Sequence, residues 1–169
     1  MKRLILSVII FMACGISQAS VSPEILTATK YASQKTGIPE WLLLAVAHAE
    51  SGFNPYAVNV AGKGYQPKSQ EEAYSIIQSA LSSGKSFDVG VMQINSFWFR
   101  KFNIPYHYGL DMQNSFTMGA EILREEIRRN GQNWLSVGFY HSKTQWRAFR
   151  YSDKIKEYAE YYKRKLAYN

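Results

Sequence analysis

The sequence of 169 residues contains a single cysteine, Cys14, so no disulfide can form within the chain. It has no apolar run of the roughly 20 residues that a membrane-spanning helix needs, because the stretch from Leu4 to Met12 is too short. Repeats, low-complexity tracts and linkers that would divide the chain are also missing. These absences favour a single domain that is stabilised by its hydrophobic core.

The start of the chain has the pattern of a secretory signal peptide. Lys2 and Arg3 precede the apolar stretch, and small residues near Ala19 follow it. We therefore expect a signal peptide over 1–19, one exported domain over 20–169 and a location in the periplasm.

A lipoprotein signal is a second interpretation of the same segment. Ala13-Cys14-Gly15 resembles the site at which bacterial lipoproteins are cleaved and lipidated, whereas Phe11 stands where such a signal usually has leucine. The mass of the intact native protein distinguishes the two interpretations. If cleavage follows Ala19, the only cysteine is removed with the signal peptide.

The charge of the chain is moderately positive. It has 20 lysines and arginines against 13 aspartates and glutamates, a formal charge of +7, and removal of Lys2 and Arg3 leaves 18 bases against 13 acids, or +5. Such a charge suits an anionic polymer, although charge alone favours the plainer interpretation that it keeps the protein soluble. Signatures of helix-turn-helix, RNA-binding and metal-finger proteins are absent, so nucleic acid is not an expected partner.

Helical spacing of apolar residues dominates the exported part of the sequence, so we expect a mainly α fold of the α+β type. Ser22-Pro23 is a typical helix start, and Ser69 with Glu72 forms a capping-box pair. The predicted helices run from Pro23 to Gly37, from Pro39 to Gly52, from Ser69 to Gly84, from Ser96 to Phe102, from Asp111 or Asn114 to Gly131, from Trp134 to Tyr140 and from Trp146 to Leu166.

Two segments between these helices predict a small β region. Residues 53–66 are rich in Gly, Pro and Asn, with Val and Tyr positions that suit a small hairpin or irregular sheet. Residues 87–95 suit a turn or short strand. In the helix that ends at Gly131, Gly119 stands beside the apolar face, where a neighbouring element can approach closely.

Glu50 is the most informative single residue of the predicted helices. Helical spacing places it on the apolar face with Val46, Leu43 and Leu42, and Gly52 places it in the last turn. The apolar wall and the partial negative charge of the helix C-terminus both disfavour an ionised carboxyl. A carboxyl that keeps its proton near neutral pH suits an acid that cleaves glycosidic bonds. The alternative is a glutamate that only ends the helix and reaches solvent or a basic partner.

Three short motifs follow one another along the chain. They are Glu50-Ser51-Gly52-Phe53-Asn54-Pro55, Gly90-Val91-Met92-Gln93-Ile94-Asn95 and Phe139-Tyr140-His141-Ser142. The first resembles the catalytic Glu-Ser motif of the lysozyme-like lytic transglycosylases, and the second resembles their Gly-Leu-Met-Gln-Ile segment. The third resembles a segment of that family in which tyrosine is followed by Asn or Ser near the active site. Three motifs in the right order make the resemblance specific, and it extends from Ile25 to Tyr162.

The resemblance implies a lysozyme-like fold, with several helices around a substrate cleft and a small irregular β region. An extra helix between Asn59 and Asp88 resembles the subgroup that is associated with conjugation, pilus and type III or type IV secretion systems. The sequence departs from the family at His141-Ser142, where many members have Asn-Ala-Gly, and at Asn95, where others have Met or Ser. These departures concern substrate contacts rather than the acid.

The resemblance also implies the chemistry. Family members cleave the β-1,4 bond between MurNAc and GlcNAc in peptidoglycan with one carboxyl group, where most glycosidases use two. The substrate's own N-acetyl group is thought to stabilise the positive charge at the sugar carbon. Glu50 would protonate the leaving oxygen and then accept a proton from the muramic acid 6-hydroxyl, which closes a 1,6-anhydro ring. No water is consumed, and no cofactor is implied.

Substrate-binding roles that the resemblance implies fall on Ser51, Asn59, Gln93, Asn95 and Tyr140. The amides are expected to contact the sugar or its N-acetyl group. The tyrosine is expected to hydrogen-bond near Glu50 or the N-acetyl group, and the serine to orient the acid or its helix end. Plainer alternatives are that the amides cap turns, that the serine caps a helix end and that the tyrosine packs in the core.

Other polar residues receive no role in the reaction. Asp88 is the nearest candidate for a second carboxylate, but a turn residue before Val89-Gly90 is the favoured interpretation. His48 and His141 do not fit a metal-binding pattern such as His-Glu-x-x-His, so no metal is expected.

Two alternatives to a lytic transglycosylase stay open. One is a muramidase that hydrolyses the same bond with water, and the other is a non-catalytic wall-binding protein that docks a secretion complex. In each case the expected partners are peptidoglycan glycan strands and components of a secretion, pilus or conjugation system.

Overall fold

Seven α-helices, one 3-10 helix and a four-stranded antiparallel sheet form the part of the chain that the computed structural model describes, residues 21–168. The expected mainly α fold with a small β region is confirmed. The predicted signal peptide over 1–19 and the alternative lipidation site Cys14 lie outside the described residues. Within residues 21–168, no helix is both long enough and apolar enough to cross a membrane.

The helices begin and end close to the predicted positions. They are α1 Pro23–Thr36, α2 Glu40–Ser51, α3 Gln70–Ser82, α4 Ser96–Phe102, η1 Tyr106–Leu110, α5 Met112–Asn130, α6 Trp134–Gly138 and α7 Gln145–Ala167. Ser22, Ser69 and Asp111 cap three of them, each side chain accepting a hydrogen bond from the backbone N–H three residues later. Gly37 and Gly52 end α1 and α2 in the left-handed conformation that glycine adopts without strain.

Two details differ from the prediction. The helix expected over 134–140 ends at Gly138, where α6 meets α7 so closely that a Cβ on this glycine would lie 2.2 Å from the carbonyl oxygen of Ala148. The 3-10 helix η1 was not predicted, because it is too short to have an apolar periodicity and its main signal is the single residue Pro105 at its start.

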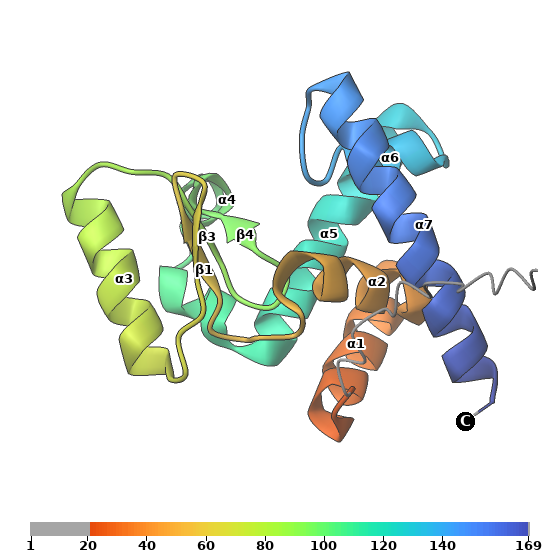
Figure 1. Ribbon diagram of the computed structural model, residues 1–169, viewed down its shortest axis with the longest axis horizontal. Helices are drawn as coiled ribbons and strands as arrows, with labels where there is room; N and C mark the ends of the chain where they lie inside the picture. The colour runs from red at the N-terminus through yellow and green to blue at the C-terminus, as the bar shows by residue number, and fades with distance from the viewer. Residues whose placement is uncertain (1–20, 169) are drawn as a thin grey trace, which may run out of the picture.

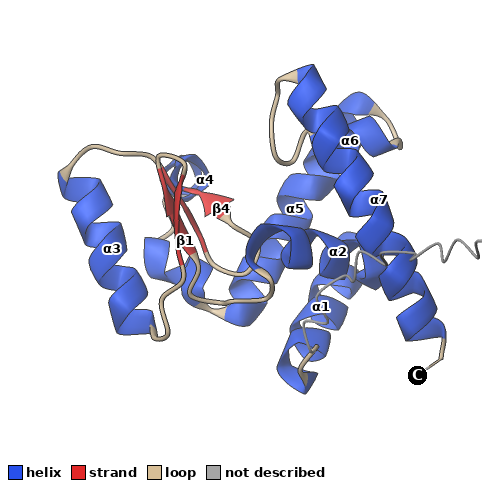
Figure 2. Cartoon of the chain, viewed as in Figure 1, coloured by secondary structure: helices blue, strands red, loops and turns tan. Residues whose placement is uncertain are grey.

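The chain folds into a sheet-containing part and a helical part, which Figures 1 and 2 show beside one another. The sheet has α3 and α4 beside it, whereas α1, α2, α6 and α7 form the helical part, and α5 packs against both α1 and β4. Helix α2 packs against α1, α5 and α7. Its residues 42–47 are at most 4% exposed, which explains why this helix is apolar on most sides.

The sheet aligns three polar residues in one row. Its strands are β1 Val58–Val60, β2 Lys63–Tyr65, β3 Phe87–Val89 and β4 Ile94–Asn95, in the order β2-β1-β3-β4. Asn59 of β1 pairs with Asp88 of β3, which in turn pairs with Asn95 of β4. Because directly opposed residues share a face of a sheet, the three side chains lie next to one another.

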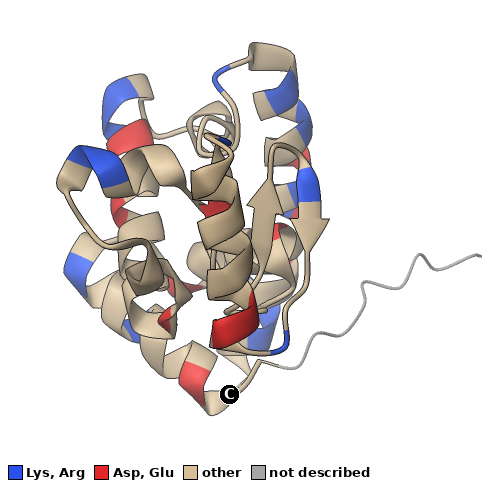
Figure 3. Ribbon diagram, turned by 90° about the vertical axis from the view of Figure 1, so that its left-hand side faces the viewer, with Lys and Arg blue, Asp and Glu red and all other residues tan. Residues whose placement is uncertain are grey.

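Basic residues are not gathered on one element. Figure 3 shows Lys and Arg on several helices, with Asp and Glu among them. Several pair with acids one helical turn away, for example Arg124 with Glu121 in α5 and Lys163 with Glu160 in α7. Exposed pairs of this kind contribute little to stability, because water and salt screen them. The charge distribution therefore does not by itself define a binding surface.

Close packing at Gly119 gives a stability prediction. A Cβ on Gly119 would lie 2.7 to 2.9 Å from three side-chain atoms of Met92. We predict that Gly119→Ala lowers the free energy of unfolding by about 1–3 kcal/mol, although alanine is the better helix former. Urea denaturation measures this, with Gln78→Ala on the exposed side of α3 as a control that changes by less than about 0.5 kcal/mol. Unchanged stability in Gly119→Ala would contradict the close contact.

Candidate active site

Glu50 lies in the last turn of α2, and its side chain is only 12% exposed. The neighbouring Ser51 hydroxyl donates to the carbonyl oxygen of Val91 over 2.8 Å. This hydrogen bond ties the end of α2 to the turn between β3 and β4. Ser51 thus helps to hold in place the helix end that carries Glu50.

Helix α7 holds the same end of α2 from the other side. The ring of Tyr158 stacks on His48 with centroids 4.3 Å apart, and the Tyr162 hydroxyl lies 2.9 Å from His48 Nδ1. The Lys154 ammonium donates to the carbonyl oxygen of Ala49 over 3.1 Å. Burial, aided by Lys154, lowers the pKa of His48, which favours a neutral ring among these aromatic partners. The acid is therefore carried by a helix end with little freedom to move.

Tyr151 of α7 makes the closest polar contact with Glu50, and the sequence analysis missed it. Its hydroxyl donates to Glu50 Oε1 over 2.6 Å, although the two residues are 101 positions apart. Burial, followed by the charge of Glu50, raises the pKa of Tyr151 well above its usual value, so the phenol keeps its proton. One signal in the sequence could have identified Tyr151. Its helical spacing from Ala148 and Ile155 places it on the buried face of α7, and a buried phenol needs a polar partner.

His141 lies beside both Tyr151 and Glu50. Its ring stacks on Tyr151, with centroids 4.7 Å apart and planes 2° apart, and its Nδ1 is 3.8 Å from Glu50 Oε1. The Glu50 carboxyl group raises the pKa of His141, against the opposing effect of burial. The sequence predicted only an apolar wall and a helix end around Glu50, so the phenol of Tyr151 and the imidazole of His141 are additional partners.

A cavity of about 320 Å³ opens at Glu50. Its lining consists of Glu50, Asn59, Asp88, Gln93, Ile94, Asn95, Trp98, Ile122, Tyr140 and His141. Four of the five predicted substrate-binding residues are in this set, and Ser51 is not. The fold thus brings residues from α2, the sheet and the segment after α6 to one cavity, with two carboxyl groups, amides and a phenol on its walls.

Asp88 also faces this cavity, and its interpretation as a turn residue was wrong. It lies in strand β3, and the turn begins only at Gly90. Asn95 Nδ2 donates to Asp88 Oδ1 over 2.7 Å, and Asn95 Oδ1 accepts from the backbone N–H of Phe97 at the start of α4. Burial raises the pKa of Asp88, with the hydrogen bond from Asn95 opposing it. Asn95 therefore positions Asp88 and caps α4 at the same time.

Gln93 is held in one orientation by the turn that precedes it. Gly90 has a φ of 80°, and a Cβ there would lie 1.8 Å from the carbonyl oxygen of Gly109, so only glycine fits. The side-chain amide nitrogen of Gln93 donates to the carbonyl oxygens of Ala57 and Gly90, each over 2.9 Å. These two bonds use both amide hydrogens. The side-chain oxygen of Gln93 is therefore the atom with which it can accept a hydrogen bond in the cavity.

Tyr140 makes a different hydrogen bond from the one expected. Its hydroxyl donates to the carbonyl oxygen of Met92 over 2.7 Å, while Tyr151 occupies the position next to Glu50. Burial, followed by the charges of Glu50 and Asp88, raises the pKa of Tyr140 well above its usual value. A buried phenol needs an acceptor, and the carbonyl of the β3–β4 turn supplies one. Tyr140 thus connects the end of α6 to that turn.

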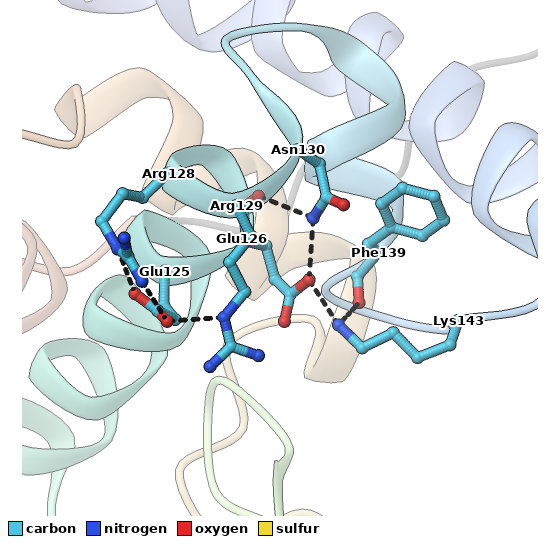
Figure 4. A network of polar contacts seen from close by, with 7 residues as sticks. All are labelled: Glu125, Glu126, Arg128, Arg129, Asn130, Phe139 and Lys143. Carbon is cyan, nitrogen blue, oxygen red and sulfur yellow. Dashed lines mark hydrogen bonds and ion pairs between the residues drawn. The ribbon is translucent and has the colours of Figure 1, made fainter.

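A buried carboxylate anchors the segment that carries His141. Glu126 of α5 is 2% exposed and forms an ion pair with Lys143, whose ammonium also donates to the carbonyl oxygen of Phe139 over 3.2 Å. Figure 4 shows these contacts together with Asn130, which approaches the same carboxylate. His141 lies between Phe139 and Lys143 in the chain, so the contacts of these two residues hold it next to Glu50.

A second cavity lies next to the first. It measures about 520 Å³, lies between α4 and α5, and shares Trp98 and Ile122 with the cavity at Glu50. Its size is greater, but its walls are mainly apolar side chains with exposed charges at the edge, and it contains no buried acid. We therefore place the chemistry in the smaller cavity. In neither cavity, nor elsewhere in residues 21–168, do three His, Cys, Asp or Glu side chains come together as a metal site requires.

The fold, the buried acid and the motifs together define the class of protein. Residues 27–161 match the family model described as the Transglycosylase SLT domain. The chain belongs to this family, and the helices and small sheet of residues 21–168 form the family's lysozyme-like fold.

Relatives of this chain include proteins named for secretion. The Type IV secretion system protein virB1 of Brucella abortus is 36% identical over 89 residues, which are 52% of this chain and 37% of the relative. Protein IpgF of Shigella sonnei is 31% identical over 118 residues, 67% of this chain and 63% of the relative. Protein virB1 of Agrobacterium fabrum is 34% identical over 83 residues, 48% and 34% of the two chains. The chain thus spans little more than a third of the virB1 relatives, and no solved structure matches it.

The buried ion pair gives a second stability prediction. Lys143→Met leaves the Glu126 carboxylate buried without its cation, so we expect the free energy of unfolding to fall by about 1–3 kcal/mol. Combining it with Glu126→Gln should restore most of this loss, because a neutral amide needs no cation. Lys156→Met, which removes an exposed pair with Asp153, is the control and should have little effect. Equal losses for Lys143→Met and Lys156→Met in urea denaturation would argue against the anchor.

Proposed function

We propose that this protein is a peptidoglycan lytic transglycosylase that cleaves the β-1,4 bond between MurNAc and GlcNAc and leaves 1,6-anhydromuramic acid ends. The observation that carries the proposal is Glu50, a largely buried carboxyl that Tyr151 holds at the wall of a polar cavity. Membership of the Transglycosylase SLT domain family supports the same reaction class.

The surroundings of Glu50 suit proton transfer from one of its two oxygens. Oε1 accepts the hydrogen bond from Tyr151. Among residues 21–168, no side chain donates a hydrogen bond to Oε2. We assign the transferable proton to Oε2, since a general acid must present its proton to the substrate and not to a protein partner.

One carboxyl group is sufficient for the proposed reaction. Glu50 gives its proton to the GlcNAc oxygen as the bond from that oxygen to C1 of the muramic sugar breaks. The carbonyl oxygen of the substrate's N-acetyl group stabilises the positive charge at C1, and the free side-chain oxygen of Gln93 is suited to accept the N–H of that group. The 6-hydroxyl then bonds to C1 and returns a proton to Glu50, so that no water and no cofactor take part.

The proposed role is to make local openings in the cell wall for a secretion, pilus or conjugation apparatus. The name of the Brucella relative, a Type IV secretion system protein, supports an association of this kind. Glycan strands of the wall are the proposed substrate. With the signal peptide expected over 1–19, the place of action is the periplasm.

Hydrolysis of the same bond is a second candidate function, and Asp88 is the observation in its favour. It is a second carboxyl in the cavity of Glu50, and burial raises its pKa. A second carboxyl can activate water in glycosidases that hydrolyse their substrate. The two functions differ in their products, since hydrolysis leaves reducing ends.

Removal of the acid tests the proposed reaction. We predict that Glu50→Gln lowers the release of muropeptides from purified peptidoglycan by at least about 100-fold, because the leaving oxygen receives no proton. Mass spectrometry of the parent's products should show anhydro ends, lighter by one water than reducing ends. Reducing ends alone would establish a muramidase instead. If neither the parent nor Glu50→Gln releases muropeptides, the protein is a wall-binding protein without this activity, and equal release by both would show that Glu50 is not the acid.

Removal of the Tyr151 hydroxyl tests the geometry of the acid. We predict that Tyr151→Phe lowers kcat/KM by roughly 10- to 100-fold, the usual effect of losing a hydrogen bond to a charged group. Tyr168→Phe is the matched control, because Tyr168 is 89% exposed. A Tyr151→Phe variant with the parental rate would show that the acid does not depend on this phenol.

A further inference from the structure

His141 lies at the wall of the cavity beside Glu50, and its place in the fold gives it a chemical meaning. Its Nδ1 is 3.8 Å from Glu50 Oε1, and its ring is parallel to that of Tyr151, the residue that donates to the same oxygen. The ion pair of Lys143 with buried Glu126 anchors the segment on one side. The position of His141 next to the acid is thus built into the fold.

We infer that His141 is a positioning residue that acts through Glu50: its imidazolium pairs with the Glu50 carboxylate that forms when the leaving oxygen takes the proton, and so stabilises that step. The inference rests on the proposed function of Glu50 and deepens it. His141 keeps its own proton throughout, since the proton given to the leaving oxygen comes from Glu50 and returns to Glu50 from the 6-hydroxyl.

Charged and titratable groups face His141 from three elements. Glu50 of α2 and Asp88 of β3 favour its cationic form, whereas Lys154 of α7 disfavours it. Tyr151, also of α7, is a neutral phenol over the working pH range because burial raises its pKa well above the usual value. The balance of two carboxyl groups against one ammonium favours an imidazolium next to Glu50.

A cation at this distance stabilises the carboxylate that is present after Glu50 has given up its proton, which helps the step. Removing the charge should therefore lower kcat, and restoring a positive charge at position 141 should recover it. Loss of packing alone does not produce this dependence on charge.

Two substitutions separate the charge of His141 from its stacking. His141→Phe keeps a planar ring against Tyr151 without a charge, and His141→Arg keeps a planar group with a permanent positive charge. We expect His141→Phe to lower kcat by roughly 5-fold with KM unchanged, because the interaction with the carboxylate formed in the step is lost. His141→Arg should keep most of the parental kcat. Equal kcat in the parent and His141→Phe, or a His141→Arg variant as slow as His141→Phe, would overturn the inference.

A titration without turnover tests the same pairing. Nuclear magnetic resonance of the His141 ring in the parent and in Glu50→Gln should show a lower pKa for His141 once the carboxylate is gone, because its main stabilising partner is lost. An unchanged titration would overturn the inference. A parent that releases no muropeptides overturns the proposed function and the inference with it, whereas an active parent whose kcat equals that of His141→Phe overturns the inference alone.

Discussion

The hydrogen bond from the Tyr151 hydroxyl to Glu50 Oε1 is the contact on which the rest of the site depends, because it fixes the acid to a second helix. This hydrogen bond forms only if the end of α2 lies against α7. The contacts of His48 with Tyr158 and Tyr162 hold the end of α2 in that position. On the opposite side, Ser51 ties the same end to the β3–β4 turn. The acid is thus positioned by both parts of the fold at once.

The order and type of the helices could be predicted from the sequence because their signals are local. Ser22, Ser69 and Asp111 cap helices through contacts that span three residues, and apolar spacing marks the buried faces. The 3-10 helix at 106–110 has no periodicity to detect. Asp88 lies in a strand because it pairs with Asn59 and Asn95, neither of which is its neighbour in sequence. The local sequence, in which Val89-Gly90 follows, suggested a turn instead.

Most of the predicted site residues were identified by motifs. Glu50, Gln93 and Tyr140 belong to the motifs, and the structure brings them to one cavity. Tyr151 could not be predicted in this way, because it follows the last motif by nine positions and meets the acid only through tertiary packing. His141 belongs to a motif, but its position beside Glu50 also depends on tertiary packing, so the contact could not be predicted from sequence.

The central claim is that the cavity at Glu50 is where a glycan strand is cut, and a crystal structure of the Glu50→Gln variant with a bound MurNAc–GlcNAc tetrasaccharide tests it most directly. We predict an intact strand whose scissile oxygen lies about 3 Å from the side chain at position 50, with an N-acetyl group next to Gln93. A tetrasaccharide seated only in the apolar cavity between α4 and α5, away from position 50, would contradict the claim.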